Sequence, residues 1–223
     1  MPDDSTGLWS VSATPLELLR TPPPRERADA ARNRAAVLQA AARLFAEHGV
    51  AAVSMDQVAA AAGVGKGTVF RRFGDKAGLA VALLDTRERE LQEAILRGPP
   101  PLGPGAGVTG RMIAFTGAYL DYLLAHLELV RMSETAAPGA RYRIGAYRFW
   151  HRHVAILLSG APDPEYAAHA FLATLAAEHV TAVLPELGEA RPRDGLAHLA
   201  RSAARDVCQD DPGRDGRGQD PDS

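Results

Sequence analysis

The residues whose types and spacing point most directly to chemistry lie at positions 63–68, where the sequence reads Gly-Val-Gly-Lys-Gly-Thr. A glycine-rich loop followed by a lysine and a hydroxyl residue can cradle phosphate groups, because its backbone N–H groups and its ammonium group point at the anion. The same residues can instead form the turn and second helix of a helix-turn-helix motif, which binds DNA. The two interpretations predict different proteins, and the neighbouring residues decide between them.

Spacing and context both disfavour the phosphate loop. The pattern G-x-x-x-x-G-K-[ST] requires a glycine five residues before Gly65, where this chain has Ala60. It also requires a hydroxyl residue directly after Lys66, although some nucleotide kinases carry Gly-Lys-Gly-Thr as this chain does. Such a loop should leave a buried β-strand, whereas this one leaves an alanine-rich stretch with a helical pattern.

The helix-turn-helix interpretation accounts for the apolar residues around the loop. They line the inner faces of two short helices and the turn between them: Met55, Val58, Ala62, Val64, Val69 and Phe73. The outward positions of the second helix carry cationic or hydrogen-bonding side chains: Lys66, Thr68, Arg71 and Arg72. Gly65 and Gly67 leave its first turn bare, so that a partner can approach the backbone closely, and helix N-termini favour phosphate. This arrangement suits a recognition helix that enters the major groove.

The helices that position this motif can be read from spacing and capping signals. Residues at i, i+4, i+7, i+8 and i+11 form one face of a first helix: Val37, Ala41, Leu44, Phe45 and His48. Gly49 lies just past its end, as a C-terminal glycine should. Ser54 and Gln57 form the S-x-x-Q capping box of the next helix, which Gly63 ends.

Two more helices follow directly. A short one is expected over residues 65–73, and Asp75 can cap a longer one that runs to about Arg97.

The composition indicates an all-α protein. Ala and Leu supply much of the apolar content, and they lose little conformational freedom in a helix. The single cysteine, Cys208, allows no intrachain disulfide, and the acidic first ten residues have no apolar core of the kind a secretory signal has. Because no apolar run is long enough to cross a membrane, we expect a cytoplasmic protein without a membrane partner.

The net charge of −2 conceals a basic block. Residues 20–76 carry +5, whereas residues 1–19, 77–208 and 209–223 carry −3, −1 and −3. A basic block on a nearly neutral chain is consistent with a local anionic partner such as DNA. A solvated charged face remains the alternative.

Residues 32–79 resemble the DNA-binding domain of the tetracycline-repressor (TetR) family of bacterial regulators. The family pattern combines a first helix that ends in Phe-x-x-x-Gly, a hydroxyl-capped second helix, and a Lys-Gly-Thr third helix followed by Phe, Lys and Leu. The matching residues are Phe45, Gly49, Ser54, Val58, Ala59, Ala62, Gly63, Val64, Lys66, Gly67, Thr68, Val69, Phe70, Phe73, Lys76 and Leu79. The match covers about a fifth of the chain.

The resemblance implies double-stranded operator DNA as a partner, and the local chemistry agrees on several contacts. Ser54 is expected to bond a phosphate through its hydroxyl and backbone N–H, and Lys76 to reach another; such contacts position a protein but read no sequence. The residues expected at base edges or flanking phosphates are Lys66, Thr68, Arg71 and Arg72. Gly65 and Gly67 are expected to permit close approach.

Phe70 departs from the family pattern, in which tyrosine is common and its hydroxyl contacts phosphate. A phenylalanine can offer only ring packing, against a sugar or a thymine methyl, or against the protein's own first helix; the two remain open. A basic N-terminal arm could also reach a minor groove, and its residues are Arg20, Arg25, Arg27, Arg32 and Arg34. A solvated tail without fixed contacts is the alternative.

Stretches poor in apolar residues divide the chain. Three consecutive prolines predict a disordered arm over residues 1–28, and a tail rich in Gly, Pro and Asp is expected to be disordered over residues 209–223. Between them we expect a helix-turn-helix domain at 29–76 and a helical domain at 77–208, which contains a Gly- and Pro-rich break at 98–107.

The second domain shows three further helical stripes. Their members are Met112, Phe115, Tyr119, Tyr122 and Leu123; then Ile144, Tyr147, Trp150 or His151, Val154 and Leu158; then Phe171, Leu175, Glu178 and Ala182. We expect Pro162–Pro164 to begin the last of these helices and Pro185 to close it.

The resemblance also implies that this domain binds a small-molecule effector and forms a homodimer. The last two long helices, at about 163–184 and 193–207, would form a four-helix interface, and a dimer suits a palindromic operator. Candidate effector-binding residues are aromatic or polar side chains on apolar faces: Arg111, Phe115, Tyr119, Tyr122, Trp150 and His151. Ordinary core packing is the alternative for each of them.

No nucleophile, base or cofactor motif indicates an enzyme, and the histidines lack the close spacing of metal ligands. The sequence thus predicts an all-α dimeric DNA-binding regulator, a repressor released from DNA by an effector. The competing classes are an all-α enzyme and a general DNA-binding protein without an effector.

Overall fold

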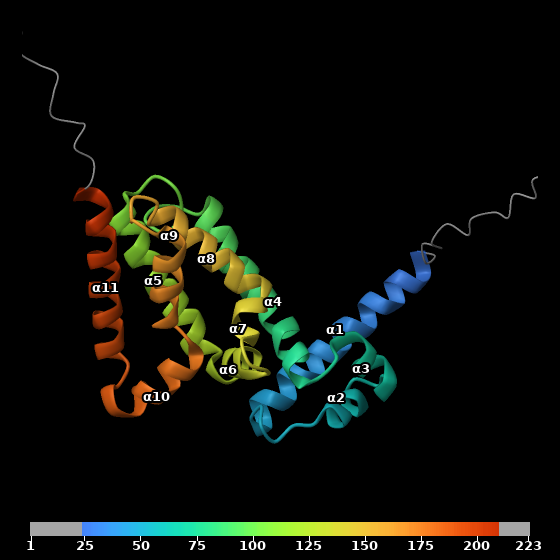
Figure 1. Ribbon diagram of the computed structural model, residues 1–223. Coiled ribbons are helices and arrows are strands. Elements are labelled where there is room, and N and C mark those ends of the chain that lie inside the picture. Colours follow the sequence, from blue (N-terminus) through green and yellow to red (C-terminus); the bar gives the residue numbers. More distant parts are fainter. Residues whose placement is uncertain (1–23, 210–223) are drawn as a thin grey trace, which may run out of the picture.

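The computed structural model describes residues 24–209, which form α-helices and no β-strand. This confirms the expected all-α fold. The helices are α1 (Pro24–His48), α2 (Met55–Ala61), α3 (Lys66–Phe73), α4 (Lys76–Arg97), α5 (Val108–Ala125), α6 (Leu127–Thr135), α7 (Ala140–Arg143), α8 (Gly145–Leu157), α9 (Pro164–Ala173), α10 (Ala177–Leu187) and α11 (Ala190–Gln209). Figure 1 shows α1–α3 gathered at one end, with α4 leading to the larger group formed by α5–α11.

Local capping signals set the helices of the smaller group. Gly49 and Gly63 end α1 and α2 with φ angles of 76° and 64°, which favour glycine. Ser54 and Gln57 form the expected capping box at the start of α2, and the Asp75 carboxylate accepts the Gly78 N–H at the start of α4. All of these boundaries agree with the sequence pattern.

The smaller group has its own apolar core. It is built from α1, the α1–α2 loop, α2, α3 and the first turn of α4: Val37, Ala41, Phe45, Val50, Val53, Met55, Val58, Ala59, Val69, Phe73 and Leu79. Leu129 and Met132 of α6 also pack against this core. The helix-turn-helix unit is therefore in direct contact with the larger group.

The first helix is longer than the sequence indicated. It begins at Pro24, so residues 24–28, for which the sequence predicts a disordered arm, are helical. Proline is well tolerated as the first residue of a helix, because its missing N–H would have no helical partner there and its φ is already helical. The remainder of the arm, residues 1–23, and the tail from residue 210 onward lie outside the described residues.

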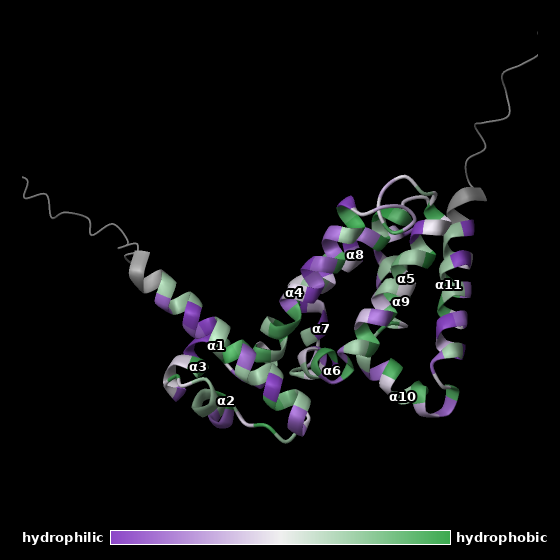
Figure 2. Ribbon diagram, turned by 180° about the vertical axis from the view of Figure 1, so that it is seen from behind, coloured by the Kyte–Doolittle hydropathy of each residue, from purple (hydrophilic) through white to green (hydrophobic). Residues whose placement is uncertain are grey.

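The larger group has a second apolar core, centred on α5. Met112, Phe115 and Leu123 of this helix are completely buried. Helix α11 packs along α5, and α8 packs on α9. In Figure 2, α5 lies between α8 and α11 and is largely hydrophobic. The two stripes expected at 112–123 and 144–158 thus face a common core.

The prediction of one continuous helix over residues 163–184 is wrong, because the chain forms two helices there. The Asp163 side chain does cap α9, by accepting the Tyr166 N–H. The chain then breaks at residues 174–176, and α10 leaves α9 at an angle of 46°. Pro185 does not close the helix but lies inside α10, where its missing N–H removes a helical hydrogen bond.

Among residues 24–209, no single helix has the length and apolar content needed to span a membrane. Two bent pairs, α5 with α6 and α9 with α10, reach that length and apolar content only when the two helices of the pair are counted together.

Candidate DNA-binding surface and ligand chamber

Helix α3 presents an apolar side to the protein and a polar side to solvent. Val69 is fully buried and Phe73 nearly so, and both contribute to the core of the smaller group. Gly65, Lys66, Gly67, Arg71 and Arg72 are exposed, and Thr68 is partly exposed. No side chain caps the N-terminus of α3. Its first N–H groups are therefore open to an external acceptor such as a phosphate oxygen.

The glycines of this helix are not required by the protein's own packing. A Cβ at Gly67 would meet no atom within 4 Å, and one at Gly65 would meet only the Thr68 hydroxyl, at 3.9 Å. Gly65 also has an ordinary φ of −60°. The absence of side chains therefore clears the outer surface of α3, where a partner would approach.

Lys66 and Phe70 lie together on this surface. The Lys66 ammonium is 2.6 Å from the Asp56 carboxylate of α2 and 6.0 Å from the centre of the Phe70 ring. Phe70 is 39% exposed, so its ring does not belong to the core formed with α1. The exposed part of the ring is therefore accessible to a partner.

The two arginines of α3 differ in their surroundings. The Arg72 guanidinium donates to the Ala30 carbonyl of α1 over 2.8 Å, so this side chain joins α3 to the N-terminal part of α1. Arg71 is exposed on the last turn. Of the predicted arm, Arg32 forms an ion pair with Asp29 on the same helix, and Arg20 lies outside the described residues.

The two expected phosphate ligands both make bonds within the protein. The Ser54 N–H and hydroxyl both donate to the Gln57 side chain, at 2.8 and 2.9 Å. The Lys76 ammonium donates to three backbone carbonyls, and they are those of Val50, Ala51 and Val53, at 2.8, 3.1 and 2.9 Å. Lys76 therefore holds the α1–α2 loop, a role that sequence reasoning missed because the three acceptors are backbone atoms.

A small chamber in the larger group collects several of the predicted effector-binding residues. Its volume is about 20 Å³, which is room for a single water molecule. Tyr119, Tyr122 and Trp150 line it, together with Glu88 of α4, Glu134 of α6 and Arg141 of α7. Phe115 lies behind this wall, with its ring centre 6.3 Å from that of Trp150.

Sequence reasoning missed the three charged residues of the chamber. For Glu88 a signal was present in the sequence. Leu84, Leu91 and Ile95 lie at i, i+7 and i+11 on one apolar face of α4, and Glu88 occupies position i+4 of the same face. Burial is the main cause that raises the pKa of the Glu88 carboxyl above its ordinary value.

Arg111 and His151 lie away from this chamber. The Nε atom of Arg111 and the Nε2 atom of His153 are both buried without a hydrogen-bond partner. Burial, with Arg111 as a second cause, lowers the pKa of His153 to about 4. The tilted rings of His151 and His169 have centres 3.9 Å apart, and a ring nitrogen of His151 lies 3.0 Å from the Glu165 carbonyl.

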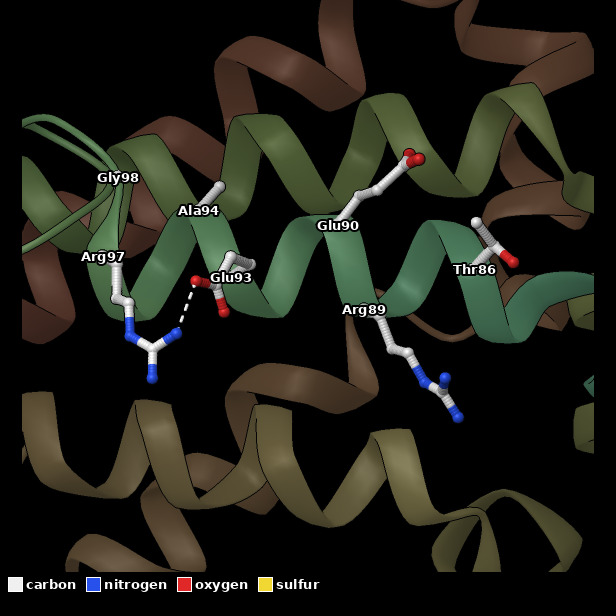
Figure 3. A pocket seen from close by; sticks show the side chains of 7 residues that line it. All are labelled: Thr86, Arg89, Glu90, Glu93, Ala94, Arg97 and Gly98. Carbon is white, nitrogen blue, oxygen red and sulfur yellow. Dashed lines mark hydrogen bonds and ion pairs between the residues drawn. The ribbon is translucent and has the colours of Figure 1, made fainter.

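An open groove of about 660 Å³ runs beside α4, but its lining is a solvated charged surface. Figure 3 shows the side chains of Arg89, Glu93 and Arg97 extending from this helix, with the Arg97–Glu93 ion pair drawn as a dashed line. That pair and the one between Arg89 and Asp85 join residues one turn apart at 2.8 and 2.9 Å. Such pairs satisfy one another and leave no group directed at a ligand.

Within residues 24–209, no group of three or more His, Cys, Asp or Glu side chains is arranged to hold a metal ion.

Two short helices joined by a sharp turn, the second of them amphipathic and cationic, define a helix-turn-helix protein. Residues 37–83 match the family described as bacterial regulatory proteins, tetR family. The residues on which the resemblance was based all lie in or beside the matched segment.

Curated relatives are similar over the same segment. An HTH-type transcriptional repressor of Mycobacterium tuberculosis is 55% identical over 51 residues, which cover 23% of this chain and 27% of the relative. An HTH-type transcriptional regulator of Staphylococcus aureus is 43% identical over 53 residues, or 24% of this chain and 29% of the relative. The chain thus spans about a quarter of the length of the curated relatives it matches.

Solved structures are similar over most of the chain. A TetR-family transcriptional regulator from Pectobacterium atrosepticum is 24% identical, with a TM-score of 0.56, over 78% of this chain and 93% of that one. A regulator of the TetR/AcrR family from Thermobifida fusca is 20% identical, with a TM-score of 0.54, over 75% and 96%. At these identities the likeness shows a common fold, including the larger helical group.

Proposed function

We propose that this protein is a transcriptional regulator that binds a specific DNA operator through α3. The observation that carries the proposal is the surface of this helix, where two glycines clear the N-terminal turn and Lys66, Thr68 and Arg71 surround it. Exposed N–H groups suit phosphate, and the longer side chains suit base edges. The repressor from Mycobacterium tuberculosis, similar over this segment, supports repression as the mode of regulation.

The regulator acts as a homodimer on a palindromic site in the cytoplasm. One short helix contacts too few base pairs for useful specificity, and two-fold symmetry doubles the number read. Helices α9, α10 and α11 supply the dimer contact in this proposal. Two exposed apolar side chains on them support it: Tyr166 on α9 is 71% exposed and Leu199 on α11 is 46% exposed.

A small molecule that enters the chamber releases the protein from DNA. The chamber lies against α4 and α6, and both helices also contact the core of the helix-turn-helix unit, through Leu79 and Leu129. A ligand with different affinities for the DNA-binding and free forms would shift the population between them.

The decisive experiment is selection of bound fragments from a random pool of double-stranded DNA. We expect recovery of a palindrome whose half-sites are about one helical turn apart. Equal binding to random DNA at physiological salt would instead identify a general DNA-binding protein. Absence of any DNA binding would refute the proposal.

A further inference from the structure

The chamber contains one carboxyl group, that of Glu88, that pairs with no cation in the described protein. Three charged side chains line it, Glu88, Glu134 and Arg141. Glu134 and Arg141 form a buried ion pair with only 8% of either side chain exposed. Their charges therefore cancel, and Glu88 is left over.

Neither member of that ion pair is available to a ligand. Arg141 also donates to the Leu172 carbonyl, and Glu134 accepts the Ala177 N–H, both over 2.8 Å. These two backbone groups flank the break between α9 and α10, so the ion pair satisfies polar groups that the break exposes. A ligand that displaced either side chain would leave buried polar groups unpaired, at a high cost.

Glu88, in contrast, is not held by bonds of this kind. Its hydrogen-bond donor is the neutral Tyr122 hydroxyl, at 2.9 Å, and it makes no ion pair within the described residues. Burial raises its pKa and so does the nearby Asp85. A carboxylate in this environment is destabilised when charged, and a cation that enters would relieve that cost.

The aromatic side chains that line the chamber also favour a positively charged ligand. The ring of Tyr119 is 5.8 Å from that of Tyr122 and 5.8 Å from that of Trp150. The faces of such rings are electronegative and attract ammonium groups, whereas they repel anions. The protein already uses this interaction nearby, since the Arg141 guanidinium lies 5.1 Å from the centre of the Tyr147 ring.

We propose that the chamber binds an organic monocation with an apolar body, such as an aryl-substituted ammonium ion, with Glu88 as its counter-ion. This inference depends on the chamber being the effector site of the function proposed above. Because the chamber has a volume of only about 20 Å³, a ligand must displace its walls to enter. Glu88 belongs to α4, whose first residue, Lys76, holds the α1–α2 loop, so this displacement acts on the helix shared with the DNA-binding unit.

The test compares a cation with its neutral isostere by isothermal titration calorimetry of the full-length protein. The probes are benzyltrimethylammonium and neopentylbenzene, which differ by replacement of the nitrogen with carbon. We expect the cation to bind at least about tenfold more tightly than the hydrocarbon, and Glu88→Gln to weaken cation binding by about tenfold. Glu93→Gln is the matched control, an exposed carboxylate on the same helix, and should leave both affinities unchanged.

Three results would overturn the inference: no cation binding, equal binding of the isostere, or undiminished cation binding by a Glu88→Gln protein that is folded by circular dichroism. Operator binding without ligand is measured in parallel. If the wild-type protein fails to select DNA but binds the cation through Glu88, the function proposed above falls while the cation site stands. If it selects DNA but ignores the cation, only the cation site falls.

Discussion

Gly67 has a hydrogen where a side chain would face open space outside the protein. Alanine there should stabilise folding by about 0.5–1 kcal/mol, because glycine in a helix costs more conformational entropy. It should weaken operator binding by about tenfold, since the new methyl group would meet the DNA. Thermal unfolding and fluorescence anisotropy measure the two effects.

Gly117 provides the control for that substitution. It lies inside α5, away from α3, and a Cβ there also meets no atom within 4 Å. Gly117→Ala should stabilise the protein without changing DNA affinity. If Gly67→Ala behaved in the same way, close approach of DNA at α3 would be contradicted.

Lys76 and Arg71 should respond differently to salt. Lys76→Met removes three hydrogen bonds to loop carbonyls and should cost about 1–3 kcal/mol of stability. The slope of log affinity against log salt should not change, because this ammonium is already bonded to three backbone carbonyls of the protein. Arg71→Ala should instead reduce the slope by about one. A reduced slope for folded Lys76→Met would restore the phosphate role that its position in the sequence first indicated.

His153 should make stability depend on pH. Burial beside Arg111 lowers its pKa from 6.5 to about 4 in the folded protein, so between these values the unfolded chain binds more protons and stability falls as pH falls. The contribution lost by pH 4.5 should be about 2–3 kcal/mol. Chemical unfolding of wild type and His153→Gln at pH 7 and 4.5 measures it; an equal decrease in both proteins would refute this role.

At the scale of elements, the break between α9 and α10 depends on the Glu134–Arg141 ion pair. Burial raises the pKa of Glu134 even though Arg141 opposes this rise. Arg141→Met would leave a buried carboxylate without a cation, which costs about 3–5 kcal/mol. Adding Glu134→Gln should recover part of the loss, because the amide oxygen can still accept the Ala177 N–H. Urea unfolding tests this, and a single-variant loss below about 1 kcal/mol would contradict it.

The same break shows which parts of the fold the sequence could predict. The starts of α2, α4 and α9 were predictable because each depends on a cap within three residues, such as Asp75 and Gly78. The break was not, because Glu134 and Arg141 reach it from α6 and α7. The aromatic residues of the chamber could be predicted from helical periodicity. Its charged residues could not, because they come together only where α4, α6 and α7 meet.

At the scale of the whole molecule, the proposed dimer depends on α9–α11. We expect the wild-type protein to elute as a dimer in size-exclusion chromatography at micromolar concentration, and Leu199→Asp to elute as a monomer with weakened operator binding. Leu96→Asp is the control, because Leu96 is similarly exposed, at 54%, but lies on α4. A wild-type monomer, or dimerisation unaffected by Leu199→Asp, would argue against this interface.

In the proposed mechanism of release, α4 is a lever, because it is continuous from Lys76 to Arg97. With a rise of 1.5 Å per residue, Glu88 and Lys76 are about 18 Å apart along the axis. A tilt of only about 5° about the chamber would therefore move the Lys76 end by about 1.6 Å. That displacement is enough to break any of the three bonds from the lysine ammonium. A rearrangement that shifts the aromatic rings of the chamber only slightly would thus release the loop that leads into α2 and α3.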